Sequence, residues 1–291
     1  MGGILEITRR RISIFLELVK FEHTIFALPF AYLGMVLATD GWPGWWKFLW
    51  ITVAMAAART VAFAVNRSAD RFYDSLNPRT ANRPIPRGAM SAVEAWGIAA
   101  AAAIVLAIAA WQLNDLCLKL FPLAVVFLVG YSYTKRFTWA SHWVLGFTDG
   151  LAPLGAWIAV RPRLSDPVPW LLLAAVTFWI AGFDLIYACQ DADFDRRVGL
   201  HSFPARFGNA RALFWAKVDH VLTVVLLGVV GVAASLGPIY WIGLAAVAVM
   251  LAYENSLVKP DDLSRVNLAF FTMNGYISIT VFVAALLGLL V

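Results

Sequence analysis

The sequence predicts an all-α integral membrane protein with nine transmembrane helices around a central cavity. Three observations support this fold class: 61% of the 291 residues are hydrophobic, only 14% are charged, and apolar stretches of about 20 residues recur along the chain. A soluble domain carries roughly 25% charged residues. A stretch of about 20 apolar residues is long enough to cross a bilayer as a helix. A lipid bilayer is therefore the expected environment.

The first 20 residues differ from the remainder of the chain. Apolar side chains fall on one side of this segment and Arg9, Arg10 and Arg11 flank it, which is typical of a basic amphipathic helix on a membrane surface. A disordered basic tail is the alternative. The remaining residues, 21–291, are expected to form one nine-helix domain. Its spans are expected at 21–39, 46–66, 91–111, 117–133, 142–160, 168–190, 212–235, 237–253 and 267–291.

Loop charge predicts how these helices are oriented. The N-terminal segment and the loops after the second, fourth, sixth and eighth spans carry most of the lysine and arginine residues, which places them in the cytoplasm. In a bacterium the membrane would be the inner membrane. The net charge of +5 is distributed over these loops, so no nucleic-acid partner is expected. Cys117 and Cys189 lie in or beside apolar helices, so no disulfide framework is expected.

Two pairs of aspartates end apolar spans on the predicted cytoplasmic side. Asp70 and Asp74 follow the second span, and Asp191 and Asp195 follow the sixth, each pair with Asp-x-x-x-Asp spacing. Corresponding members of the two pairs are both 121 residues apart, which indicates an internal duplication. Repeated halves of membrane proteins often place a binding site at their interface. Because ionised side chains at membrane depth are costly, the pairs are candidate functional residues.

Helical spacing brings further polar side chains to the same stripes. At 100° per residue, Asn66 shares the stripe of the first aspartate pair. On the second helix, Asp184 and Tyr187 lie on or beside the stripe of Asp191, whereas Asp193 points to the opposite side. We therefore expect each helix to present a row of oxygen atoms to one place, and we expect Asp193 to matter less.

Carboxylate oxygens are ligands that Mg²⁺ prefers, and protein-bound Mg²⁺ commonly binds substrate phosphates as well. The two pairs are therefore predicted to hold Mg²⁺ and to clamp a diphosphate, with the metal ligands Asp70, Asp74, Asp191 and Asp195. Arginines of the neighbouring loops can chelate the remaining phosphate oxygens. The alternative is that the aspartates only cap helix ends or pair with Arg67, Arg71, Arg196 and Arg197. Two clusters on one membrane face, each leading into a basic loop, favour the metal site.

Three polar stretches of the sequence, taken in order along the chain, form a recognisable pattern. Residues 66–88 contain Asn66 and the first aspartate pair, followed by Asn-Arg-Pro; residues 131–138 read YSYTKRFT; residues 184–202 contain the second aspartate pair. Together they resemble the signatures of the UbiA family of intramembrane prenyltransferases, and the resemblance covers nearly the whole chain. One departure is Arg67, which stands where many members have an aspartate.

The resemblance implies Mg²⁺-dependent transfer of a polyprenyl group from polyprenyl diphosphate to a carboxylated hydroxyaromatic acceptor, in ubiquinone or menaquinone biosynthesis. Arg67 and the opening stretch 20–30 are similar to the menaquinone branch of the futalosine route, whose acceptor would be 1,4-dihydroxy-6-naphthoate; 4-hydroxybenzoate remains open. The implied catalytic residues are Asp191 (the candidate base), Lys135 and Arg136. The implied substrate-binding residues are Asn66, Arg59, Arg83, Lys135, Arg136, Tyr187 and Asp184. A basic anchor on the cytoplasmic side is the alternative role of Lys135 and Arg136.

Arg59 lies seven residues before Asn66, about 10 Å deeper on the same stripe. A buried arginine needs an anionic partner. That partner is expected to be the acceptor carboxylate or a phosphate oxygen, or else a structural partner, Asp149 or Asp184. The alternative function for the whole chain is a membrane transporter with repeated halves, although a transporter would not need two aspartate pairs on one face.

Overall fold

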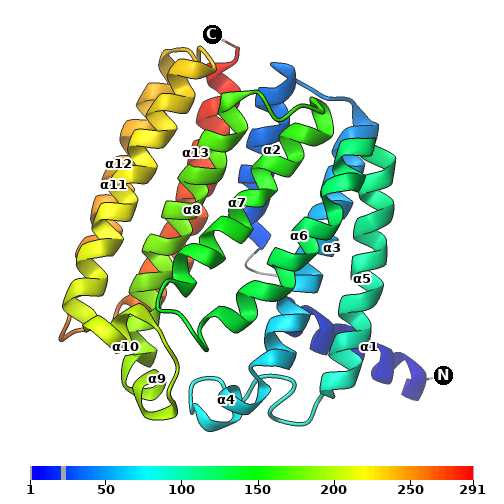
Figure 1. Ribbon diagram of the computed structural model, residues 1–291, viewed down its shortest axis with the longest axis vertical. Coiled ribbons are helices and arrows are strands. Elements are labelled where there is room, and N and C mark those ends of the chain that lie inside the picture. The colour runs from blue at the N-terminus through cyan, green and yellow to red at the C-terminus, as the bar shows by residue number, and fades with distance from the viewer. Residues whose placement is uncertain (1, 21–23, 291) are drawn as a thin grey trace.

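The computed structural model describes residues 2–20 and 24–290 (Figure 1). The start of the first expected span, at 21–23, lies outside the described residues. The helices are α1 (Gly2–Leu18), α2 (Thr24–Thr39), α3 (Trp45–Ala69), α4 (Arg71–Leu76), α5 (Ala92–Leu113), α6 (Asp115–Thr134), α7 (Ser141–Val160), α8 (Pro167–Ala188), η2 (Cys189–Asp191), α9 (Ala192–Val198), α10 (Phe203–Phe207), α11 (Asn209–Ala233), α12 (Pro238–Ser256), η3 (Leu268–Met273) and α13 (Asn274–Gly288).

The described residues confirm the all-α membrane fold. Eight helical segments are long and apolar enough to cross a bilayer, and α2 contributes a shorter apolar stretch, Leu28–Thr39. These nine segments correspond to the nine expected spans. Two of them differ in detail: the sixth continues through η2 and α9 to Val198, and the last begins with the π-helix η3. The chain is therefore a multi-pass integral membrane protein.

The long helices run side by side, and the short helices α4, α9 and α10 gather at one end of the bundle, opposite the C-terminus (Figure 1). α1 lies at this same end, at an angle to the long helices (Figure 1). Because α3 leads into α4 and α8 leads into α9, both aspartate pairs lie at this end. The expectation that the two pairs share one face of the membrane protein is met.

Each aspartate pair lies across a break in its helix. α3 and α4 meet at Asp70, whose backbone has φ −90° and ψ 5°. α8 reaches α9 through the single 3-10 turn η2, which ends at Asp191 with φ −100° and ψ 1°. The spacing argument assumed an uninterrupted helix, and the structure corrects it. The two aspartates, 121 positions apart, share this conformation, which also occurs at other helix ends of the chain such as Ala234.

Glycines allow α7 to lie close against α8. A Cβ atom built on Gly146 would lie 2.2 Å from the carbonyl oxygen of Thr177, and one built on Gly150 would lie 2.6 Å from that of Leu173. Small residues at such positions let the backbones of membrane helices approach each other. The close contact fixes α7, which carries His142, relative to α8, which carries Asp184.

We expect Gly146→Leu to lower the melting temperature of the detergent-solubilised protein, because the new side chain would occupy the space of the α8 backbone. Overpacking of this kind costs about 1–3 kcal/mol. Gly97→Leu is the matched control, since Gly97 is exposed on α5 and a Cβ there would meet no atom within 4 Å. Equal melting temperatures of the two variants would contradict this packing argument.

Candidate active site

A cavity of about 520 Å³ lies between α3, α5, α6, α7 and α8. It begins among the polar side chains near α4 and α9 and extends to Leu113, Cys117 and Ile158, near the opposite ends of α5, α6 and α7. Every site residue predicted from the sequence lines this one cavity: Arg59, Asn66, Asp70, Asp74, Arg83, Lys135, Arg136, Asp184, Tyr187, Asp191 and Asp195. The structure thus brings both aspartate pairs and their predicted partners together, while their individual roles stay predictions.

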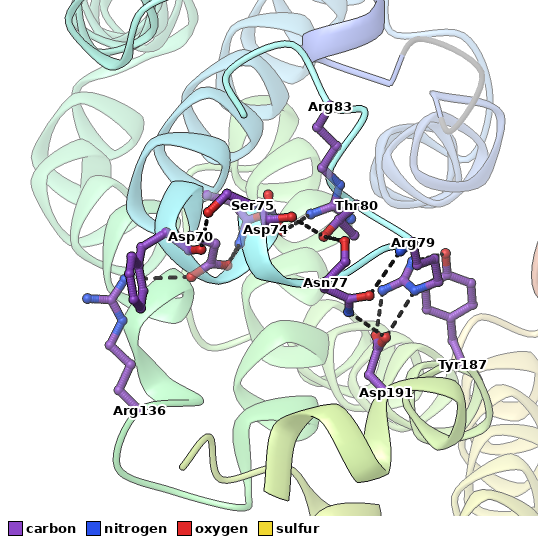
Figure 2. A network of polar contacts seen from close by, with 12 residues as sticks. Asp70, Asp74, Ser75, Asn77, Arg79, Thr80, Arg83, Arg136, Tyr187 and Asp191 are labelled. Atoms are coloured by element: carbon purple, nitrogen blue, oxygen red, sulfur yellow. Dashed lines mark hydrogen bonds and ion pairs between the residues drawn. The ribbon is translucent and has the colours of Figure 1, made fainter. Parts of the chain in front are cut away.

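The first aspartate pair is held by one amide and two guanidinium groups, and Figure 2 shows the two arginines, Arg83 and Arg136. Asp70 accepts a hydrogen bond from Asn66 Nδ2 at 3.0 Å, and Arg136 Nη2 lies 3.6 Å from its Oδ1. Asp74 accepts a hydrogen bond from Arg83 Nη1 at 2.6 Å. Arg136 also donates to the carbonyl oxygen of Ala69 at 2.7 Å, which fixes it at the break between α3 and α4.

The second aspartate pair is held by residues from other parts of the chain. Asp191 forms an ion pair with Arg79, whose Nε donates to Oδ1 at 3.0 Å, and Asn77 Nδ2 donates to the same oxygen at 3.0 Å (Figure 2). Lys135 Nζ lies 2.8 Å from Oδ2 of the buried Asp195. Each of the four carboxylates therefore has its own cation.

Arg79 connects the two halves of the site. It comes from the loop after α4, donates a hydrogen bond to Tyr187 Oη at 2.8 Å, and lies over the Tyr187 ring at 5.0 Å (Figure 2). The Tyr187 ring also packs against Phe270 of η3, with ring centroids 4.2 Å apart. The loop of the first motif is thus tied directly to the helix of the second motif.

The environment of these groups shifts their titration. Burial and the neighbouring Asp74 carboxylate raise the pKa of Asp70 to about 6, although Arg136, Lys135 and Arg83 oppose the shift. Burial alone would lower the pKa of Arg79, but the hydrogen bond and charge of Asp191 raise it above its ordinary value. Burial and the second carboxylate thus make the charged form of Asp70 costly in this cavity.

The donor set fits a divalent cation. Within the described part of the chain, no three His, Cys, Asp or Glu side chains already form a compact metal-binding group. Each carboxylate is instead turned toward its own basic partner. The four carboxylates nevertheless line one cavity, and the buried Oδ2 atom of Asp74 has no hydrogen-bond partner. Oxygen ligands of this kind suit Mg²⁺.

The alternative ion pairs expected from neighbouring arginines are mostly not formed. Among Arg67, Arg71, Arg196 and Arg197, only Arg196 pairs with an aspartate, and its partner is Asp193 at 2.8 Å. The Asp193 side chain is 88% exposed, as its helical phase predicts. Arg67 is buried against the ring of Phe63, at 5.8 Å, and lines the cavity.

Arg59 reaches the cavity without a fixed anionic partner. Its guanidinium lies over the Phe63 ring at 5.1 Å, and its buried Nη2 atom has no hydrogen-bond partner. Among the described residues no carboxylate lies within ion-pair distance of it, although the Asp149 carboxylate is near enough to interact with its charge. The alternative, a direct structural pair with Asp149 or Asp184, is therefore not formed. Asp184 is paired instead with His142, at 2.7 Å.

The site contains residues that the sequence-based site prediction omitted. Asn77 and Arg79 open the basic loop after the first motif, but their contact with Asp191 spans more than 110 residues and depends on the fold. His142 has no metal-ligand spacing to another histidine or cysteine, and nothing in its sequence neighbourhood indicates a carboxylate partner. Phe270 reaches the cavity from the π-helix η3.

Comparison with known proteins agrees with this geometry. Residues 27–277 match the model of the UbiA prenyltransferase family, and the chain belongs to that family. It is 32% identical over 276 residues to a protein of Cupriavidus necator named 4-hydroxybenzoate octaprenyltransferase, covering 94% of this chain and 95% of that protein. A Ralstonia nicotianae protein of the same name is 31% identical over 286 residues, covering 96% of both.

Solved structures show the same fold. The apo structure of a UbiA homologue from Aeropyrum pernix K1 superposes with a TM-score of 0.83 at 34% identity, covering 91% of this chain and 98% of that one. A UbiA homologue from Archaeoglobus fulgidus bound to DMAPP and Mg²⁺ superposes with a TM-score of 0.70 at 21% identity, covering 95% and 99%. Family membership and these relatives identify the chain as an aromatic prenyltransferase and disfavour the transporter alternative.

We expect Arg79→Gln to destabilise the protein measurably, because it leaves the Asp191 carboxylate without its cation and disconnects the loop after α4 from α8. The free energy of unfolding should fall by about 1–3 kcal/mol, measured in detergent without divalent cations. Arg196→Gln is the control, since it removes only the exposed pair with Asp193. Equal stability of both variants would show that the Arg79 contact does not hold the two halves together.

Proposed function

We propose that this protein transfers a polyprenyl group from polyprenyl diphosphate to a carboxylated hydroxyaromatic precursor of ubiquinone or menaquinone, in a Mg²⁺-dependent reaction. The observation that carries the proposal is the convergence of two aspartate pairs, each with basic partners, on one membrane-embedded cavity. The names of the relatives from Cupriavidus necator and Ralstonia nicotianae support 4-hydroxybenzoate as the acceptor. The DMAPP and Mg²⁺ bound to the Archaeoglobus fulgidus homologue support the donor and the metal.

The diphosphate binds at the polar end of the cavity. The proposed Mg²⁺ ligands are Asp70, Asp74, Asp191 and Asp195. Bound Mg²⁺ would neutralise the charge that develops on the leaving diphosphate. Arg83, Lys135 and Arg136, which pair with the carboxylates in the structure, would bind phosphate oxygens when those carboxylates hold the metal. The same cations would thus serve both the carboxylates and the diphosphate.

The prenyl chain occupies the apolar part of the cavity. Below the charged groups the walls consist largely of Met55, Leu106, Leu120, Phe121 and Leu128, with Ala110 and Ile158 farther along. A prenyl chain that enters laterally from the bilayer passes from one apolar environment to another. The apolar walls also keep out water that would react with an allylic cation. The cavity therefore holds the reactive carbon at the boundary between its charged and apolar parts.

The acceptor binds one layer below the diphosphate. The Nη2 atom of Arg59, which has no hydrogen-bond partner, is offered to the carboxylate of the acceptor, while Asn66 and Tyr187 contribute polar atoms closer to the diphosphate. The ring carbon ortho to the hydroxyl attacks the first prenyl carbon, and the carbon–oxygen bond to the diphosphate breaks with its electron pair leaving on the diphosphate. The sequence-based prediction of Asp191 as the base stays a prediction, and its oxygens are occupied by Asn77 and Arg79.

The basic loops near α4 and α9 favour a cytoplasmic active site and a cytoplasmic N-terminus, by the positive-inside rule. In a bacterial host this would be the cytoplasmic face of the inner membrane. Such an orientation lets a water-soluble aromatic acceptor arrive from the cytoplasm while the prenyl donor arrives through the bilayer.

We expect Asp70→Ala and Asp191→Ala to abolish Mg²⁺-dependent prenyl transfer by membranes supplied with a long-chain prenyl diphosphate and either 4-hydroxybenzoate or 1,4-dihydroxy-6-naphthoate. Mass spectrometry identifies the product and thereby the acceptor. Asp193→Ala is the matched control on α9 and should retain most activity, because its side chain is exposed outside the cavity. Full activity of Asp70→Ala or Asp191→Ala would refute the metal site.

Arg59→Gln should raise the KM for the aromatic acceptor by about 10-fold or more, since a charge-assisted hydrogen bond to a carboxylate contributes about 1.5–3 kcal/mol. The KM for the prenyl diphosphate should remain within about twofold of the parent value. Arg211→Gln, at an exposed position on α11, is the control. If the Arg59 variant instead affects only the KM for the diphosphate, Arg59 binds phosphate and not the acceptor.

A further inference from the structure

A buried histidine stands directly behind one of the cavity carboxylates. The side chain of His142 is only 3% exposed, and its Nδ1 atom lies 2.7 Å from Oδ2 of Asp184. Its other ring nitrogen, Nε2, accepts a hydrogen bond from the backbone N–H of Phe203 at 3.2 Å. The imidazole thus joins α7 to α8 and to the first residue of α10.

The backbone contact determines which nitrogen of His142 carries the proton. A backbone N–H can only donate, so Nε2 must be the unprotonated nitrogen of a neutral imidazole. The proton is therefore on Nδ1, where it is donated to Asp184. The N–H of Phe203 lies in the first turn of α10 and has no partner within that helix, so the histidine also satisfies a helix-end donor.

The Asp184 carboxylate consequently has one occupied and one available oxygen. Oδ2 is taken by His142, whereas Oδ1 accepts no hydrogen bond from the described residues. Asp184 lines the cavity and its side chain is 23% exposed. It lies seven residues before Asp191, about 10 Å deeper by helix rise, as Arg59 does relative to Asn66. An acceptor held by Arg59 would place its ring at this depth.

We propose that Asp184 is the base that takes the proton from the acceptor hydroxyl, and that His142 is the positioning residue that aims its free oxygen into the cavity. The proposal rests on the proposed function and deepens it. Oδ1 accepts the hydroxyl proton, and the ortho carbon of the resulting phenolate forms the new bond to the first prenyl carbon as diphosphate departs with the electron pair. The ortho ring proton then passes to the departing diphosphate, and Asp184 returns its proton to the oxygen.

His142 is a positioning residue because the carboxylate of Asp184, and not the imidazole, offers a free atom to the cavity. His142 borders the cavity, but its side chain is only 3% exposed and both of its ring nitrogens are already engaged, so it acts on the acceptor through the carboxylate. A neutral N–H donor offsets part of the cost of a carboxylate at membrane depth and leaves its second oxygen basic. The aromatic rings of Trp143 and Phe203 pack edge-on, 5.7 Å apart, beside the imidazole and restrict its movement.

The direct test compares acceptors whose hydroxyl groups differ in acidity, using 4-hydroxybenzoate and its ring-fluorinated derivatives. With the least acidic acceptor, Asp184→Asn should reduce kcat by about 100-fold or more, the usual contribution of a general base. With acceptors already ionised at the assay pH, the parent-to-variant ratio of kcat should be at least tenfold smaller, because no hydroxyl proton remains for the base to take. The KM for the prenyl diphosphate should stay unchanged, which shows that the variant is folded and binds its donor.

Double substitution separates positioning from a purely structural role of His142. His142→Phe should lower kcat, and His142→Asn, which retains an N–H near the Nδ1 position, should recover part of the loss. Adding His142→Phe to Asp184→Asn should lower kcat little further, because both substitutions act through the same carboxylate. His201→Asn, an exposed histidine on the same side of the protein, is the control and should behave as the parent.

Two results would overturn the inference while leaving the proposed function intact. The first is an active parent enzyme for which Asp184→Asn lowers kcat by the same factor with every acceptor. The second is a double variant whose loss of kcat equals the product of the losses of the two single variants. A parent enzyme that prenylates none of the acceptors would overturn the proposed function and this inference with it. The predicted outcome is a kcat ratio of parent to Asp184→Asn that falls as the acceptor becomes more acidic, together with a double variant little slower than Asp184→Asn alone.

Discussion

The placement of four carboxylates at the end of a membrane-embedded bundle is the constraint on which the remainder of the structure depends. An isolated carboxylate at this depth is costly, so each must have a cation or a metal nearby. Asp70, Asp74, Asp191 and Asp195 receive theirs from Arg136, Arg83, Arg79 and Lys135. Most of these contacts join segments far apart in the chain, so the groups that neutralise the carboxylates also hold the two halves together.

Depth along the cavity separates three kinds of chemistry. The charged end, at the breaks of α3 and α8, suits a diphosphate and its metal. About two helical turns deeper, Arg59 and the Asp184–His142 pair form a second polar layer in an otherwise apolar wall. Beyond that layer the cavity is lined by alkyl and aromatic side chains. A prenyl diphosphate and a carboxylated phenol can therefore be held at once with their reacting atoms between the two polar layers.

Much of this arrangement could be predicted from the sequence, because the signals are local. Apolar length locates the spans, and the repeated Asp-x-x-x-Asp spacing identifies the charged end. The helical phase of Asp193 was also readable and agrees with its exposed position. Each of these signals depends on residues within a few turns of one another.

The remainder depended on tertiary contacts that no local pattern encodes. The breaks at Asp70 and Asp191 interrupt sequences that read as continuous helices. Arg79 is one of several arginines in its loop, and only the fold shows that it reaches Asp191. Arg59 was only one possible partner of Asp184, and the partner in the structure is His142, brought close by the glycine contact between α7 and α8.

The central claim is that the two aspartate pairs form one cation-filled pocket, and the most direct test measures Mn²⁺ binding by electron paramagnetic resonance in the presence of diphosphate. Mn²⁺ affinity is measured for the parent, Asp74→Ala, Asp195→Ala and the double variant. A single pocket predicts strongly non-additive losses, with the double variant little worse than either single one. Additive losses of Mn²⁺ binding free energy would show two independent sites and contradict the account. The same holds if one aspartate pair binds Mn²⁺ equally well when the other pair is disrupted.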